Sequence, residues 1–134
     1  MSELVSLFNL ALKIRANAYA PYSKFKVGAA IVSSNNNMYS GCNVENISYP
    51  NGTCAETGAI AQMVANGDTL IKEIVVVADS KQLITPCGAC LQRIFEFSDK
   101  HTKVHLADLT SIKKTYLISD LLPLAFNEKE LKKW

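Results

Sequence analysis

Three cysteines and one glutamate, held in one spacing, constrain this 134-residue chain more than any other feature. Cys54-Ala55-Glu56 comes first, and Pro86-Cys87-Gly88-Ala89-Cys90 follows about thirty residues later. Three thiolates are one ligand short of a closed tetrahedral zinc site, so the fourth position is left for water or substrate. A carboxylate two residues after the first cysteine can exchange protons with that water. The spacing therefore predicts one zinc ion on Cys54, Cys87 and Cys90, with Glu56 as the catalytic proton carrier.

The same pattern resembles the signature of zinc nucleobase deaminases, in which His or Cys at the first position precedes a later Pro-Cys-x-x-Cys. Other segments extend the resemblance through most of the chain: Phe25-Lys26-Val27-Gly28-Ala29-Ala30, Gly41-Cys42-Asn43-Val44-Glu45-Asn46, and Leu121-Leu122-Pro123 before Phe126. In this order they are similar to the small homotetrameric cytidine deaminases of nucleoside salvage. The resemblance implies hydrolysis of cytidine and 2′-deoxycytidine to uridine and 2′-deoxyuridine plus ammonia, with one zinc ion per subunit.

Bulk properties agree with a small enzyme. A length of 134 residues and a hydrophobic content of 49% predict one catalytic domain that spans residues 1–134. The net charge of +2 is spread along the chain without a basic stripe, so a nucleic-acid partner is not expected. No apolar run approaches the roughly 20 residues that span a bilayer. Glu3 stands where a secretory signal would be basic, and four cysteines without a leader favour metal ligands over disulfides. We expect a cytoplasmic protein.

Hydrophobic periodicity predicts helices alternating with strands. Apolar residues at three- and four-residue steps predict a helix over 4–18, and Pro21 ends it. Further helices are expected from near Cys54 to Gly67, with Ile60, Met63 and Val64 inward, and from Pro86 to about Phe97. Strands are expected at 25–33, 38–44, 71–78, 103–109 and 115–118, and a short helix at 128–134. This alternation predicts an α/β fold, a three-layer α/β/α sandwich around a mixed sheet, for which the resemblance implies five strands.

Helix starts explain why these cysteines suit a metal. If Cys54 and Cys87 each begin a helix, free backbone amides and the positive end of the helix dipole stabilise their thiolates. Cys90 lies one turn after Cys87, so both sulfurs can reach one ion. Three thiolates around Zn²⁺ nevertheless leave a site charge of about −1, which makes bound water harder to ionise. The resemblance implies an arginine at the position of Thr57 and a basic residue at the position of Leu91, so this chain departs from the family there, and Arg93 is expected on a different side of its helix.

The resemblance also implies substrate contacts. Glu56 accepts the proton of water and then protonates the ring N3 and the departing amine. The backbone amides of Ala55 and Cys87 donate to the base. Asn43 and Glu45 are two apart on an extended segment, so their side chains face one way and suit the sugar 3′-hydroxyl. Phe25 matches the aromatic residue that packs against the base, and Phe126 matches one donated to a neighbouring subunit, which implies a homotetramer with a shared pocket. No phosphate cradle is evident, which favours a nucleoside over a nucleotide.

Several alternatives stay open. Cys42 is assigned to the core, although as a fourth ligand it would close the zinc site. Asn43 and Glu45 could be solvated strand-end residues, and Phe25 and Phe126 could be core. Tyr22 and Tyr49 match loop positions near the pocket in the family. A deaminase of another aminated nucleoside is a rival function, and the short chain disfavours a polynucleotide editor. A non-catalytic zinc module is another rival, and it would have no need of Glu56.

Overall fold

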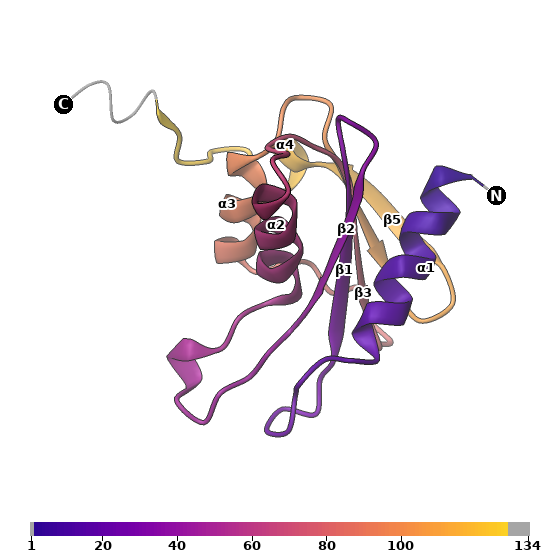
Figure 1. Cartoon of the computed structure of the whole chain (residues 1–134), viewed down its shortest axis with the longest axis vertical. Coiled ribbons are helices and arrows are strands. Elements are labelled where there is room, and N and C mark those ends of the chain that lie inside the picture. The colour runs from indigo at the N-terminus through magenta and orange to yellow at the C-terminus, as the bar shows by residue number, and fades with distance from the viewer. Residues whose placement is uncertain (1, 129–134) are drawn as a thin grey trace.

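A five-stranded mixed sheet in the order β2-β1-β3-β4-β5 forms the middle of the computed structural model, which describes residues 2–128 (Figure 1). Its strands are β1 (Val27–Ser33), β2 (Met38–Cys42), β3 (Ile71–Ala78), β4 (Lys103–Ala107) and β5 (Ile112–Leu117). Strand β1 runs antiparallel to both β2 and β3, β4 is parallel to β3, and β5 is antiparallel to β4. The parallel pair needs a crossover helix between its strands, and α3 (Gly88–Glu96) provides it.

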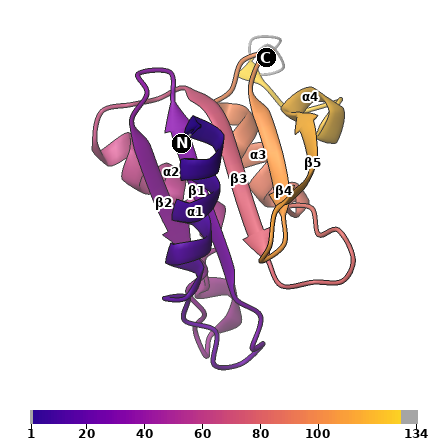
Figure 2. The same cartoon turned by 90° about the vertical axis from the view of Figure 1, so that its right-hand side faces the viewer.

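Helices cover both faces of this sheet, which confirms the predicted three-layer α/β/α fold. Helix α1 (Glu3–Arg15) lies on one face, and α2 (Ala55–Ala65), α3 and the short α4 (Ile118–Leu121) lie on the other (Figures 1 and 2). Each face has its own apolar core, one around Leu7 and Val75 under α1 and one around Met63 and Ile74 under α2 and α3. Among residues 2–128, no helix combines the length and the apolar character that crossing a membrane requires.

The structure corrects several predicted boundaries. Helix α1 ends at Arg15 and not at residue 18, and β2 stops at Cys42. Val64, predicted to pack inward on α2, is 43% exposed. The last strand is longer than predicted, and it leads directly into α4, which periodicity missed because one helical turn is too short to show a period. The helix predicted at 128–134 lies outside the described residues apart from Glu128.

Helix α2 approaches the sheet at Gly41 more closely than any side chain there would allow. A Cβ atom on Gly41 would lie 2.6 Å from the carbonyl oxygen of Ala55 and closer still to the amide nitrogen of Ala59. Gly58 faces Gly41 across the same contact, so the two backbones meet with no side chain between them. This contact brings the first turn of α2, which carries Glu56, directly against the end of β2.

Asp68, just after α2, ties the β1–β2 hairpin to the end of that helix. Its buried carboxylate accepts hydrogen bonds from Tyr39 Oη at 2.7 Å and Ser33 Oγ at 2.8 Å. The amide nitrogens of Asn35 and Asn37 donate two more, at 2.7 and 3.1 Å. The bond from Tyr39 and the other three lower the pKa of Asp68 well below its usual range. The hairpin between β1 and β2 is thus held by a buried anion as well as by its turn.

Asp68→Asn is expected to destabilise the fold in a pH-dependent way. A carboxylate whose pKa is lowered on folding stabilises the protein fully above its unfolded pKa of about 3.9, and the contribution is lost as the pH falls through the folded value. Urea unfolding of zinc-loaded protein should therefore show a large deficit for Asp68→Asn at pH 7 that shrinks towards pH 3. Asp79→Asn, at an exposed aspartate, is the control. A deficit that stays constant from pH 7 to pH 3 would contradict the assignment.

Candidate metal centre

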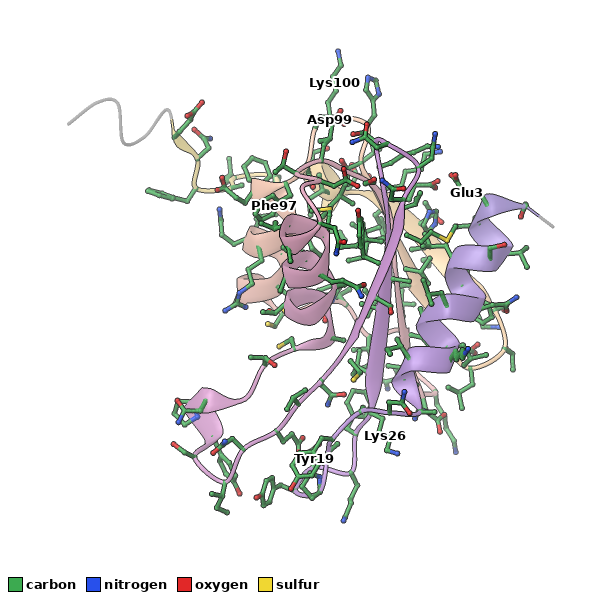
Figure 3. The ribbon with its side chains drawn as sticks, viewed as in Figure 1. Glu3, Tyr19, Lys26, Phe97, Asp99 and Lys100 are labelled. Carbon is green, nitrogen blue, oxygen red and sulfur yellow. The ribbon has the colours of Figure 1, made fainter. Side chains whose placement is uncertain are left out.

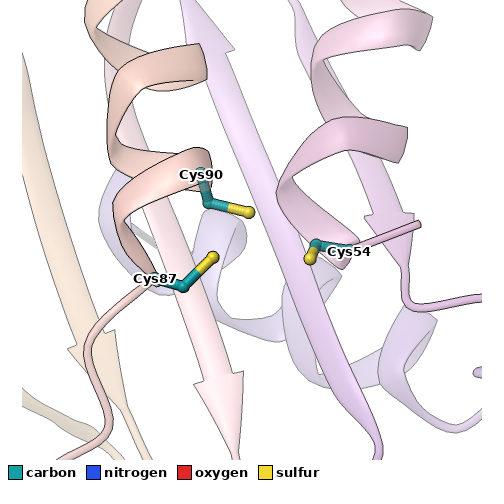
Figure 4. Close-up of side chains that lie close together, drawn as sticks. All are labelled: Cys54, Cys87 and Cys90. Carbon is teal, nitrogen blue, oxygen red and sulfur yellow. The ribbon is translucent and has the colours of Figure 1, made fainter. Parts of the chain in front are cut away.

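Three sulfurs from two helices meet at one point. Cys54 immediately precedes α2, Cys87 immediately precedes α3, and Cys90 lies in the first turn of α3 (Figure 4). The Sγ atoms all lie within 4.8 Å of one another. Cys42, half-buried at the end of β2, is not a member of this group, so a closed four-cysteine site is not formed by the residues that the structure describes. The arrangement is the open three-ligand set predicted from the spacing.

The donor set suits zinc. Zn–S bonds of about 2.3 Å in a tetrahedral site place the sulfurs about 3.8 Å apart, a separation that lies within the 4.8 Å limit of this cluster. Thiolate is a soft ligand that selects zinc over magnesium or calcium, which prefer oxygen. Cys90 is buried, Cys54 is half-buried and Cys87 is exposed, so the fourth side faces the solvent-accessible cavity. Substrate can therefore reach an ion bound here.

The three thiols differ in acidity. Backbone amides of Cys90 and Ala89 at the start of α3 lower the pKa of Cys87, as expected for a helix N-terminus. Burial raises the pKa of Cys54 and of Cys90. A helix start was predicted to favour the Cys54 thiolate, but burial raises the pKa of this thiol, and the hydrogen bond from Cys90 and the charge of Arg93 lower it by less. Zinc binding must displace protons from these two thiols, which makes affinity pH-dependent.

Arg93 supplies a positive charge that the sequence analysis placed elsewhere. Its guanidinium Nη1 lies 4.0 Å from Cys90 Sγ, because residues three apart on a helix share a face. The prediction that Arg93 points away was wrong. Leu91, where the resemblance implied a basic residue, packs into the core instead. A guanidinium beside a ligand thiolate offsets part of the negative charge that three thiolates bring.

Glu56 sits in the first turn of α2 and is only 4% exposed. Burial raises the pKa of its carboxyl, and its own backbone amide, the Cys90 thiol and the charge of Arg93 lower the pKa by less. A carboxyl with a raised pKa takes up and releases protons more readily near neutral pH than an ordinary glutamate. Glu56 lies on the wall of the same cavity as the three cysteines.

That cavity, of about 370 Å³, brings most of the predicted site together. Asn43, Glu45, Ala55 and Glu56 all line it with the three cysteines. Phe25 and Phe126 do not, and they are 38% and 57% exposed. Tyr49, on the 3-10 helix η1 (Tyr49–Asn51), does line it. Several further residues line the cavity that were not predicted from the sequence, among them Val27 and Thr85. Their only indication in the sequence is that they lie next to the motifs of Phe25 and of Pro86-Cys87.

The two polar residues predicted to bind a sugar make local hydrogen bonds. Asn43 bridges the chain before β1, since its Oδ1 accepts from Val27 N and its Nδ2 donates to Phe25 O, each at 2.8 Å. The carboxylate of Glu45 accepts the backbone amides of Tyr22 and Ser23 at 3.0 and 3.1 Å. Neither side chain is simply solvated.

The segment 43–45 joins the part of the cavity that Asn43 and Glu45 line to the cysteine cluster. Val44 exchanges two backbone hydrogen bonds of 2.9 Å with Thr53, the residue before Cys54. On its other edge, Tyr19 N donates to Asn43 O at 3.0 Å and Glu45 N donates to Tyr19 O at 2.8 Å. The first metal ligand and the two polar side chains are thus placed by one short ladder of backbone bonds.

Known proteins are similar to this chain in sequence and in fold. A model of the cytidine and deoxycytidylate deaminase zinc-binding region matches residues 1–106. A cytidine deaminase from Sporosarcina psychrophila is 41% identical over 119 residues, which cover 89% of this chain and 88% of that protein. The crystal structure of a cytidine deaminase from Burkholderia pseudomallei has a TM-score of 0.87 and 39% identity, covering 94% of this chain and all of that one. The crystal structure of the cytidine deaminase from Mycobacterium tuberculosis has a TM-score of 0.81 and 30% identity, covering 95% of this chain and 99% of that one.

Arg93→Gln is expected to weaken zinc binding by about tenfold, the lower end of the effect that residues contacting metal ligands usually have. The loss of one positive charge leaves the thiolates less compensated. Competition with a chromophoric chelator at pH 7 measures the change, and Lys100→Gln removes the same charge from an exposed loop residue as a control. Equal zinc affinity in wild type and Arg93→Gln would show that the 4.0 Å contact does not stabilise the site.

Proposed function

The chain belongs to the family of the cytidine and deoxycytidylate deaminase zinc-binding region, and on that premise we propose that it hydrolyses cytidine and 2′-deoxycytidine to uridine and 2′-deoxyuridine with release of ammonia. Pyrimidine salvage is the pathway in which such a reaction serves. The observation that carries the proposal is the meeting of three thiols and the buried Glu56 on one cavity of about 370 Å³. The whole chain acts as one catalytic domain.

Cys54, Cys87 and Cys90 hold one zinc ion in this proposal. Zinc bound there supplies Lewis acidity, which lowers the pKa of water beside the substrate. The residues around the ion compensate its charge and keep one side open to substrate. Cys90 and Cys54 are ionised on binding, and Arg93 carries the nearest compensating charge. The open side of the ligand set faces the cavity, so an aminated base can approach the ion.

Glu56 moves the protons. Its carboxylate accepts a proton from the attacking water, then delivers it to the ring N3 of the pyrimidine. A second proton passes through the same carboxyl to the departing amine, which leaves as ammonia, and the C4 carbonyl of the product forms. The burial that raises the pKa of Glu56 keeps it able to hold a proton between these steps.

Ala55, Asn43 and Glu45 bind the nucleoside. The amide of Ala55 belongs to the first turn of α2, where N–H groups have no partner within the helix and are free to donate to a base. Asn43 and Glu45 take the sugar 3′-hydroxyl at the other side of the cavity. Phe25, which does not line the cavity of the single chain, is expected to pack against the base from the loop that precedes β1, whose backbone Asn43 holds.

Assembly completes the pocket. Phe126 is 57% exposed and Leu124 is 94% exposed, at the end of a segment that Gln92 holds through a 2.7 Å hydrogen bond to Phe126 O. Exposed apolar side chains of this size favour a protein–protein contact. We propose a homotetramer of dihedral symmetry in which Phe126 enters a neighbour's pocket. Reduced thiol ligands fit a cytoplasmic location.

Glu56→Gln is expected to keep zinc and to lose turnover. Glutamine keeps the size and hydrogen bonding of glutamate but carries no proton, and acid–base catalysis in one step is worth about 10²–10⁴-fold. Because Glu56 acts in more than one step, a loss of at least that size is expected in the absorbance assay with cytidine. Glu96→Gln, at the exposed end of α3, should deaminate normally. Near-normal turnover by Glu56→Gln would rule out the mechanism as written.

Phe126→Ala is expected to raise the KM for cytidine and to complement Glu56→Gln. If pockets are shared, mixing the two inactive or impaired chains creates some pockets with an intact Glu56 from one subunit and an intact Phe126 from another. Activity should then rise above that of either parent after subunit exchange. A fully active monomer, shown by light scattering at the assay concentration, would contradict the shared pocket.

A further inference from the structure

Ser23 holds the carboxylate of Glu45 from the loop that joins α1 to β1. Its hydroxyl donates a short hydrogen bond to Glu45 Oε2, and the backbone amides of Tyr22 and Ser23 donate to Oε1 at 3.0 and 3.1 Å. A carboxylate offers about four acceptor positions, two on each oxygen. The loop therefore occupies both positions on Oε1 and one on Oε2, and one acceptor position on Oε2 remains for a ligand.

The direction of the Ser23 hydroxyl is set by its two neighbours. Its oxygen accepts the backbone N–H of Phe25 at 3.0 Å, so the hydroxyl proton is left to point towards Glu45. An ionised carboxylate can only accept, which fits this direction. The bond from Ser23 is also the main reason why the pKa of Glu45 is lowered, so the carboxylate stays an acceptor at neutral pH.

The loop is itself tied to the segment that carries Glu45. Tyr19, at its start, hydrogen-bonds the backbone of Asn43 and Glu45, and the ring of Tyr22 lies 6.0 Å from that of Tyr49. Figure 3 shows Tyr19 and Lys26, which flank the loop, at the end of the molecule opposite Asp99 and Lys100. Ser23 thus holds Glu45 against a backbone that is already fixed in place.

We propose that Ser23 is a positioning residue for sugar binding: it directs the remaining acceptor position of Glu45 Oε2 into the cavity, where the 3′-hydroxyl of the nucleoside donates to it. The proposal rests on the sugar contact assigned to Glu45 under the proposed function. Ser23 does not line the cavity that holds Glu56 and the cysteines, so it touches no reacting atom. Its effect falls on the binding of the sugar and leaves the proton transfers unchanged.

The test compares cytidine with 3′-deoxycytidine in five zinc-loaded proteins: wild type, Ser23→Ala, Ser23→Thr, Glu45→Gln and Ser80→Ala. Ser23→Ala should raise the KM for cytidine roughly tenfold with kcat little changed, because a hydrogen bond to a charged group is worth about tenfold or more in binding. The ratio of kcat/KM between cytidine and 3′-deoxycytidine should fall towards one in Ser23→Ala and in Glu45→Gln. Ser23→Thr keeps the hydroxyl and should restore the wild-type ratio.

Ser80→Ala is the matched control. Ser80 Oγ accepts the amide of Gln82 at 3.2 Å, the same two-residue turn that Ser23 makes with Phe25, but the structure shows no carboxylate bonded to it. For Ser80→Ala, the kcat/KM ratio between cytidine and 3′-deoxycytidine and the thermal midpoint should match wild type. The thermal midpoint of Ser23→Ala shows whether that variant is folded. If the kcat/KM ratio stays at the wild-type value in Ser23→Ala but falls towards one in Glu45→Gln, the positioning role of Ser23 is overturned and the sugar contact of Glu45 is not. A wild-type ratio in Glu45→Gln as well would overturn the sugar contact and this inference with it.

Discussion

The contact between α2 and the sheet at Gly41 decides where the chemistry of this protein takes place. Because no Cβ separates the two backbones, the start of α2 lies directly against the end of β2. Cys54 and Glu56 belong to that start, and the segment 43–45 continues from that strand. A helix held farther from the sheet would carry Cys54 and the Glu56 carboxylate away from α3. The cysteine cluster, the buried Glu56 and the cavity that they line all depend on this approach.

Charge is concentrated in a small and partly buried space around these groups. Three thiols and the Glu56 carboxyl share one wall of the cavity, and burial raises the pKa of three of the four, namely Cys54, Glu56 and Cys90. Because a raised pKa favours the neutral form of a thiol or carboxyl, these three groups carry less negative charge before a cation binds. Arg93 provides a cation of the protein's own beside Cys90. The resemblance implied basic residues at Thr57, on α2, and at Leu91, on α3, whereas here Arg93, two residues after Leu91, supplies the charge.

Short loops carry the recognition side of the cleft, and they are braced by backbone bonds at both edges. The segment 43–45 pairs with Tyr19 on one side and Thr53 on the other, outside the five-stranded sheet. Side chains that could bind a sugar are therefore also structural: Asn43 holds the entry to β1, and Glu45 gathers the amides of the loop before it. Side chains that are held in this way are already in place before a ligand arrives, which lowers the cost of ordering them on binding.

The sequence by itself determined the fold class, the strand β3 and the three ligands, because these depend on local patterns: an apolar run of Ile74 to Val77, helix periodicity, and the Cys-x-x-Cys spacing of one helical turn. It also placed Cys54 at the start of a helix, since that helix's inward residues begin soon afterwards. Helix α4 could not be predicted from the sequence, because a single helical turn shows no period. The exposure of Val64 could not be predicted either, because the neighbouring elements decide how wide the buried face of α2 is.

Tertiary structure decided what the local pattern could not express. Arg93 lies beside Cys90, and burial raises the pKa of Cys54, because both depend on what packs around the two helices. Ser23 meets Glu45 across a separation of 22 residues that no motif spans. Phe25 and Phe126 do not line the cavity of a single chain. Local patterns report which groups are present, whereas distance, burial and charge around each group arise only when segments far apart in the chain pack together.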